Sequence, residues 1–219
     1  LTAMSNIVAA AVIVTAGQLP LTAVLLVFAS LCFYYGGMAL NDCFDYQEDL
    51  RERPDRPLPS GQISKTTGWA IGFGLLAVGL VLCALANLNT YLPLLIGAAL
   101  CCSIVGYNRF VKDGMSGSIV MALCRYFNWL LGLSAITLLS ASFDIELALI
   151  ALPIFFYICG LTYISKQETL AENRSAMTVL LILLILTGLS VFSLIWIAPA
   201  LFNGSPLITF ALSSLFIYF

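Results

Sequence analysis

Residues 41–61 read NDCFDYQEDLRERPDRPLPSG, and this polar stretch interrupts an otherwise strongly apolar chain. Of the 219 residues, 61% are hydrophobic and 9% are charged, yet six of the eleven acidic and three of the nine basic residues lie here. A linker between two membrane helices could be shorter, and it need not place acids first, then arginines, then Pro-Leu-Pro-Ser-Gly. This concentration of charge therefore indicates a functional site.

If the helix that precedes this stretch continues through it, its polar side chains fall on one side. At about 100° per residue, six of them share a sector of about 120°. These six are Asn41, Asp42, Asp45, Glu48, Asp49 and Glu52. Like charges that lie so close repel one another, and a divalent cation would remove the repulsion. Mg²⁺ suits the pattern because it takes oxygen ligands, usually one or two carboxylates together with substrate phosphates.

Three arginines, Arg51, Arg53 and Arg56, follow the acids directly. The planar guanidinium group is suited to binding phosphate through two parallel hydrogen bonds. Acids followed by arginines therefore predict a site for Mg²⁺ and a diphosphate group. The alternative interpretation is an acidic loop that binds no ligand.

The same stretch resembles the first signature of the UbiA superfamily of intramembrane prenyltransferases. That signature reads N-D-x-x-D-x-x-x-D and is followed by Arg-Pro-Leu-x-Ser-Gly. Here Asn41, Asp42, Asp45 and Asp49 match its first part, and residues 56–61 match its second part. The resemblance implies an all-α bundle of typically nine transmembrane helices. It also implies Mg²⁺-dependent transfer of a prenyl group from a prenyl diphosphate donor.

Composition agrees with a protein that is embedded in a lipid bilayer. The mean hydropathy is +1.03, and the apolar runs of about 15–25 residues match the length of a bilayer-spanning helix. We expect one domain over residues 1–219, a multi-pass integral membrane protein, with further residues beyond both ends. The net charge of −2 argues against a nucleic-acid partner.

Eight helical segments are predicted, and they form two related halves of four helices each. The resemblance implies a ninth helix beyond residue 219. The predicted segments are 1–17, 21–44, 65–86, 91–108, 117–139, 147–165, 176–198 and 206–219.

Basic residues are distributed unequally between the predicted loops. Eight of the nine lie after the second, fourth and sixth helices, or at the ends of these loops, and the other loops contain none. Because cytoplasmic loops carry an excess of Lys and Arg, these three loops are expected on the cytoplasmic side.

A second polar cluster, YISKQETLAENR at residues 163–174, follows the sixth helix. Internal duplication is common in membrane folds, which predicts that this cluster completes the site. The superfamily places a second Asp-rich motif here, whereas this chain has no aspartate in the cluster. Glu168 and Glu172, spaced four residues apart, are the candidate ligands for a second Mg²⁺, and Lys166 could replace a cation. The Ser-Lys-Gln-Glu form resembles the Ebo-type branch of the superfamily.

Two further pairs of polar residues are candidates for the substrate site. Arg125 lies inside the fifth helix, where a charge is costly and normally faces the bundle interior or a wet cavity. Asn128 shares its face, so the pair predicts a polar spot in the substrate cavity; the alternative is a tie between helices through backbone carbonyls.

In the loop after the fourth helix, Tyr107 and Lys112 loosely match a tyrosine and basic residue of the superfamily. A basic membrane anchor is the alternative for Lys112.

The predicted function is transfer of a prenyl group to a lipophilic or aromatic acceptor, with polycyclic, polyol and lipid acceptors left open. No histidine is present, which excludes a histidine base. The alternatives are a transporter or lipid-binding protein of the same fold and, less favoured, a cation channel or exchanger. The predicted catalytic set is Asp42, Asp45, Arg56, Lys112, Lys166 and Glu168. The predicted metal ligands are Asp42, Asp45, Asp49, Glu168 and Glu172, and the other predicted binding residues are Asn41, Arg51, Arg53, Arg125 and Asn128.

The topology is tested with single cysteines at positions 55 and 172 in a cysteine-free background. Because both positions lie in basic loops, Asp55→Cys and Glu172→Cys should react with a membrane-impermeant thiol reagent from the cytoplasmic side. Labelling of the two positions from opposite sides of the membrane would overturn both the topology and a site composed of the two loops.

Overall fold

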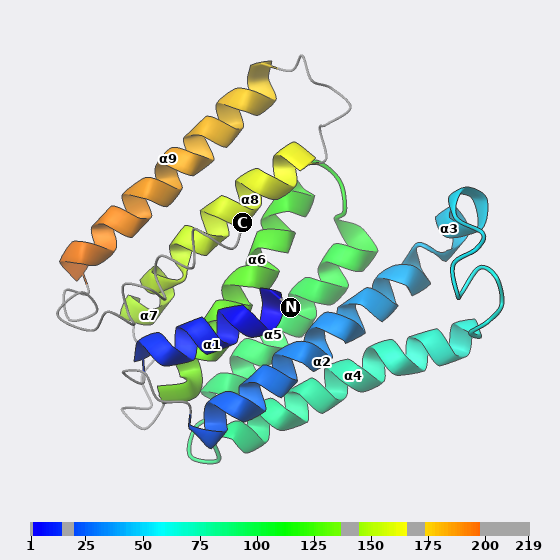
Figure 1. Ribbon diagram of the computed structural model, residues 1–219, viewed down its shortest axis with the longest axis horizontal. Helices are drawn as coiled ribbons and strands as arrows, with labels where there is room; N and C mark the ends of the chain where they lie inside the picture. Colours follow the sequence, from blue (N-terminus) through cyan, green and yellow to red (C-terminus); the bar gives the residue numbers. More distant parts are fainter. Residues whose placement is uncertain (1, 15–19, 137–144, 166–173, 198–219) are drawn as a thin grey trace.

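The structure, a computed structural model, describes residues 2–14, 20–136, 145–165 and 174–197, and these residues form helices and their connections. Figure 1 shows the arrangement of the helices, which run along the molecule in a bundle. The helices are α1 (Thr2–Val14), α2 (Leu21–Phe44), α3 (Tyr46–Glu52), α4 (Lys65–Ala86), α5 (Leu92–Phe110), α6 (Gly114–Leu133), the short 3₁₀ helix η1 (Ser134–Ile136), α7 (Ile145–Ile150), α8 (Leu152–Ser165) and α9 (Arg174–Ile197).

Four described segments are long and apolar enough to cross a membrane, namely α2, α4, α5 and Ala148–Ser165. A helix suits that environment because it satisfies its backbone hydrogen bonds internally. The predicted all-α class and polytopic bundle are confirmed. The division into two related halves and a ninth helix stay predictions, and the predicted segment 206–219 lies outside the described residues.

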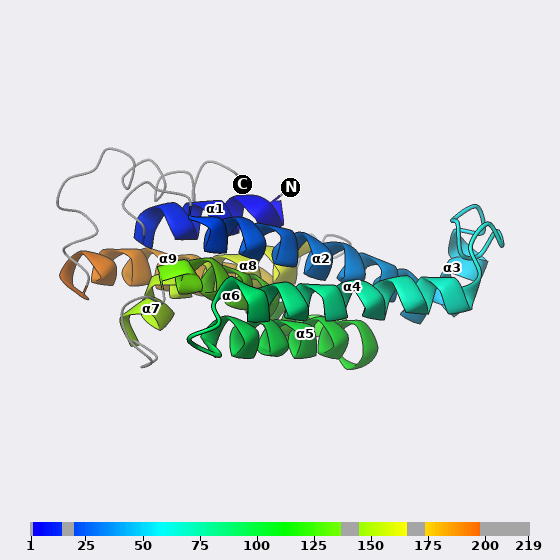
Figure 2. The same ribbon diagram turned by 90° about the horizontal axis from the view of Figure 1, so that it is seen from below.

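The long helices α2, α4, α5, α6, α8 and α9 alternate in direction along the chain. In Figure 1, α2, α5 and α8 run one way, and α4, α6 and α9 run the other way. Helix α2 packs against α4 and α5, α6 against α5 and α8, and α8 against α9. Helix α1 packs against α2 and α6 on one face, while α5 lies on the opposite face (Figure 2). The carboxyl ends of α2, α5 and α8 therefore point to the same side of the bundle.

Local sequence signals set several of the helix ends. Ser64 caps α4 by accepting a hydrogen bond from the N–H of Thr67 at 3.1 Å. The segment predicted as one helix over 147–165 is instead two helices, with α7 ending at Ile150 and α8 beginning at Leu152. Pro153, which has no backbone N–H, is the second residue of α8 and cannot continue the hydrogen bonding of α7. The predicted 117–139 helix is also displaced, since α6 spans Gly114–Leu133.

Glycines on α4 allow it to approach α2 closely. A Cβ atom at Gly72 would lie 2.7 Å from Cδ2 and Cγ of Leu40, and one at Gly79 would lie 2.5 Å from Cε1 of Phe33. Leu40 and Phe33 are both buried. Small residues at such contacts let membrane helices pack closely without side chains between them. The contact fixes the end of α2, where the polar stretch begins.

We expect Gly72→Ala to destabilise the protein in detergent by about 1–3 kcal/mol, because the added methyl group overpacks the contact with Leu40. Gly74→Ala is the matched control on the same helix, since a Cβ atom there meets nothing within 4 Å. It should be neutral or gain about 0.5–1 kcal/mol from helix propensity. Denaturation midpoints measure both; equal midpoints for the two variants would show that the close approach is unimportant.

Candidate functional site

The polar stretch begins with a break in the helix. Helix α2 ends at Phe44, Asp45 has φ −83° and ψ 2°, and α3 begins at the next residue. The predicted end of the second helix at Phe44 is confirmed, so a helix that continues through this stretch, the condition under which six polar side chains would share one sector, is not present. Glu48 and Glu52 are exposed, whereas Asp49 is buried with 4% of its surface accessible.

Arg56 joins two of the acidic residues. Its Nη1 atom donates to Oδ2 of Asp49 at 2.8 Å and to Oδ1 of Asp42 at 3.3 Å. The arginine is held in place by a tight fold of the segment that follows it. The N–H of Ser60 donates to the carbonyl of Arg56 at 2.9 Å, and Gly61 adopts a positive φ of 79° that favours glycine. The Arg-Pro-Leu-Pro-Ser-Gly segment thus positions a guanidinium group over the end of α2.

Lys112 brings the loop between α5 and α6 to the same place. Its ammonium group forms an ion pair with Asp45 and donates to Oδ1 of Asn41 at 3.1 Å. A second bond ties the same helices together, since Nδ2 of Asn108 donates to the carbonyl of Gly37 at 3.2 Å. Residues that lie about seventy positions apart in the chain therefore meet at the end of α2.

The structure brings together six of the residues that the sequence singles out: Asn41, Asp42, Asp45, Asp49, Arg56 and Lys112. Arg51 and Arg53 are exposed and form no ion pair with the residues that the structure describes, so their role in binding phosphate stays a prediction. Lys166, Glu168 and Glu172 lie outside the described residues, and so does the predicted approach of Glu168 to Asp42 and Asp45.

The chemistry of this cluster fits Mg²⁺ held together with a phosphate group. Its three carboxylates and two cations leave one negative charge unbalanced. The donors are oxygens, which Mg²⁺ prefers. Within the described ranges no three His, Cys, Asp or Glu residues converge on one metal position. Asp42 and Asp45 would therefore supply one or two carboxylates, and phosphate and water oxygens would complete the shell.

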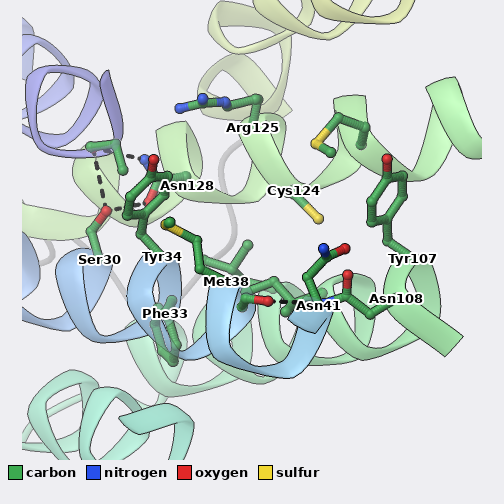
Figure 3. A pocket seen from close by; sticks show the side chains of 15 residues that line it. Ser30, Phe33, Tyr34, Met38, Asn41, Tyr107, Asn108, Cys124, Arg125 and Asn128 are labelled. Carbon is green, nitrogen blue, oxygen red and sulfur yellow. Dashed lines mark hydrogen bonds between the residues drawn. The ribbon is translucent and has the colours of Figure 1, made fainter. Parts of the chain in front are cut away.

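A cavity of about 300 Å³ adjoins the cluster between α2, α5 and α6 (Figure 3). Asn41 belongs to both, because it lines the cavity and accepts the hydrogen bond from Lys112. Several wall residues, including Tyr34 and Met38, were not predicted from the sequence. A signal for these two was available, since residues 34, 38 and 41 recur on one helical face. The lining residues are Ala3, Ser30, Phe33, Tyr34, Gly37, Met38, Asn41, Leu100, Ile104, Tyr107, Asn108, Met121, Cys124, Arg125 and Asn128.

The predicted pair in the fifth membrane segment lines this cavity, but its members differ. Asn128 is buried; its Nδ2 atom donates to the carbonyl of Ala3 at 3.0 Å, and its Oδ1 atom accepts from Ser30 at 2.7 Å. It therefore ties α6 to α1 and α2. Arg125 has no hydrogen-bond or ion-pair partner among the described residues, so its guanidinium group remains available to a ligand.

Fold and site together define an integral membrane helix bundle with a charged site at one end of an internal cavity. The sequence comparison agrees with this class. Residues 3–219 match the UbiA prenyltransferase family, and the chain belongs to this family.

Several similar proteins share one name. The chain is 38% identical over 88 residues to the digeranylgeranylglyceryl phosphate synthase of Metallosphaera sedula, covering 40% of this chain and 30% of that protein. It is 31% identical over 142 residues to the enzyme of that name from Methanoregula boonei, covering 59% and 51%. These matches span about a third to a half of the relatives' length.

A solved structure from a study of digeranylgeranylglyceryl phosphate synthase in membranes also matches. It has a TM-score of 0.69 at 18% identity and covers 99% of this chain and 88% of that one. At this identity the likeness shows a shared fold.

We expect Asp49→Asn to destabilise the loop after α3, because Asp49 is the buried partner of Arg56. The loss should be about 1–3 kcal/mol, the cost of leaving a buried polar group poorly satisfied. Glu48→Gln is the matched control, since Glu48 is exposed and forms no ion pair with the described residues. Thermal unfolding and limited trypsin cleavage after Arg51 measure the effect. The same unfolding and cleavage behaviour in both variants would contradict an anchoring role for Asp49.

Proposed function

We propose that this chain catalyses Mg²⁺-dependent transfer of a prenyl group from a prenyl diphosphate to a lipophilic acceptor within the membrane. One observation carries the proposal: the charged cluster and the cavity share Asn41. A prenyl diphosphate has a charged head joined to an apolar tail. The cluster complements its head, and the cavity walls and surrounding bilayer complement its tail.

The cations of the cluster are placed to change partners when the donor binds. Lys112 and Arg56 neutralise carboxylates in the structure, and both side chains are partly exposed. On binding, phosphate oxygens would replace carboxylate oxygens around these cations, which frees Asp42 and Asp45 to act as metal ligands. The bound Mg²⁺ would stabilise negative charge on the leaving diphosphate. Arg56 and Lys112 would add to that stabilisation through hydrogen bonds.

The reaction balances without any further reagent. The bond between prenyl C1 and the diphosphate oxygen breaks, and its electron pair leaves with the diphosphate. A new bond forms between C1 and the acceptor nucleophile, whose proton passes to a carboxylate or to water. The aromatic rings of Tyr34 and Tyr107 line the cavity, where their faces can stabilise positive charge that develops on the allyl group.

The names of the relatives bear on the acceptor. Proteins that match part of this chain are named for synthesis of digeranylgeranylglyceryl phosphate. We therefore propose a glyceryl phosphate ether lipid as the first acceptor to assay, with geranylgeranyl diphosphate as the donor. Aromatic and polyol acceptors are the alternatives.

We further propose that the charged cluster faces the cytoplasm, where a water-soluble diphosphate product can leave.

We expect Asp42→Ala and Asp45→Ala each to lower kcat/KM for the donor by about 10²–10³-fold, the usual loss when one electrostatic contact to a reacting group is removed. Glu48→Ala is the control and should be much milder, because Glu48 is exposed and outside the cluster. Radiolabelled geranylgeranyl diphosphate, assayed with Mg²⁺ and with EDTA, measures transfer, diphosphate release and donor binding. Normal donor binding by Asp42→Ala would overturn the metal assignment. A parent protein that binds donor but never releases diphosphate would instead be a lipid-binding or transport protein.

A further inference from the structure

Arg125 is the charged side chain among the residues that line the cavity, and the proposed donor site does not use it. It lies on α6 within an apolar segment and lines the cavity. A charged group at such a position is costly, and in membrane proteins it normally has a partner or faces a functional cavity. Among the described residues Arg125 has no such partner, so the structure leaves its positive charge facing the cavity.

A purely structural role is disfavoured by what happens to the neighbouring polar groups. Asn128 and Ser30 bond to each other and to the carbonyl of Ala3, which closes the junction of α1, α2 and α6. Arg125 takes no part in that network, although its guanidinium group offers five N–H donors. The tie between these helices is complete without it.

The donor diphosphate is also a poor partner for Arg125. The cations that face the acidic cluster are Arg56 and Lys112, and Lys112 reaches the cavity through Asn41. Figure 3 shows the Arg125 side chain extending toward the side where Asn128 and Tyr34 lie, away from Tyr107 and Asn41. Tyr34 precedes Asn41 by seven residues on α2, which is two helical turns or about 10 Å along the axis. That separation places Arg125 at the other end of the cavity.

We infer that Arg125 recognises an anionic group, a carboxylate or a phosphate, on the acceptor. This inference rests on the proposed function, because it assigns the second substrate of the same site. An acceptor anchored at Arg125 would direct its nucleophile toward the prenyl carbon near Asn41. Arginine suits this role, since its planar guanidinium group binds two carboxylate or phosphate oxygens at once and stays charged in apolar surroundings.

The test uses two pairs of acceptors that differ in the anionic group. One pair is geranylgeranylglyceryl phosphate and geranylgeranylglycerol; the other is 4-hydroxybenzoate and 4-hydroxybenzyl alcohol. The full-length parent protein in nanodiscs should prefer the anionic member of at least one pair by about 10–100-fold in kcat/KM, the range of one buried charge-assisted contact. The pair that shows the preference distinguishes a phosphate from a carboxylate. Acceptor-dependent thermal stabilisation provides a second readout that needs no turnover.

Arg125→Met should abolish this preference. Arg125→Lys should keep part of it, because lysine retains the positive charge but lacks the planar guanidinium group that binds two oxygens at once. Donor binding, measured with a non-hydrolysable geranylgeranyl thiodiphosphate, should be unchanged in both variants. Tyr126→Phe is the matched control, because Tyr126 lies beside Arg125, is absent from the cavity wall and, among the described residues, donates to the carbonyl of Ala148. It should keep the preference of the parent.

Two results would overturn the inference while leaving the proposed function intact. One is a parent protein that transfers prenyl groups with no preference within either pair. The other is an Arg125→Met variant that loses activity equally toward both members of a pair, or loses donor binding, as a structural or donor-binding residue would. Failure of the parent to bind the donor with Mg²⁺ would instead overturn the proposed function, and the inference with it.

Discussion

The site depends on neutralising carboxylates at the carboxyl end of a helix. Asp42 lies in the last turn of α2 and Asp45 directly follows it, where the helix dipole already places negative charge. The mutual repulsion of the acids adds to this cost. The positive charges that offset it come from two separate loops, Arg56 after α3 and Lys112 after α5. Neutralisation of the acids therefore determines how both loops fold against the end of α2.

The ion pairs of this cluster are not equivalent. Asp42 and Asp45 have partly exposed side chains, 44% and 24%, and such pairs contribute little to stability. They can exchange a cation for a metal ion at small cost. The Asp49 side chain is only 5% exposed, and losing its partner would strand a buried charge. One acid of the motif thus anchors the loop, while the other two remain exchangeable, although all three fit one sequence pattern.

The sequence predicts the composition of this site better than its geometry. The run from Asn41 to Asp49 identifies the acids and their need for a cation, because charge in an apolar chain is costly wherever it lies. The predicted end of the second helix at Phe44 agrees with the structure, but the run does not show which of its acids is buried: Glu48 is exposed and the adjacent Asp49 is buried. The motif resemblance identifies Lys112 as a candidate, but its contact with Asp45 depends on how α2 and α5 pack. The glycines of α4 specify that kind of packing, but their partners Leu40 and Phe33 are identified only by the folded chain.

Arg125 shows that the energetic cost of a charge in an apolar helix can predict a site from the sequence. The burial of an arginine in an apolar helix predicts a cavity or a partner from sequence alone. The structure supplies the cavity and, in its described part, no partner, so the cost is met when a ligand binds. Because Arg56 and Lys112 already lie at the opposite end, beyond Asn41, a ligand with a single anionic head cannot satisfy both ends of the cavity at once. Two substrates with one anionic group each can do so, and their two charges would then hold the reacting atoms between them.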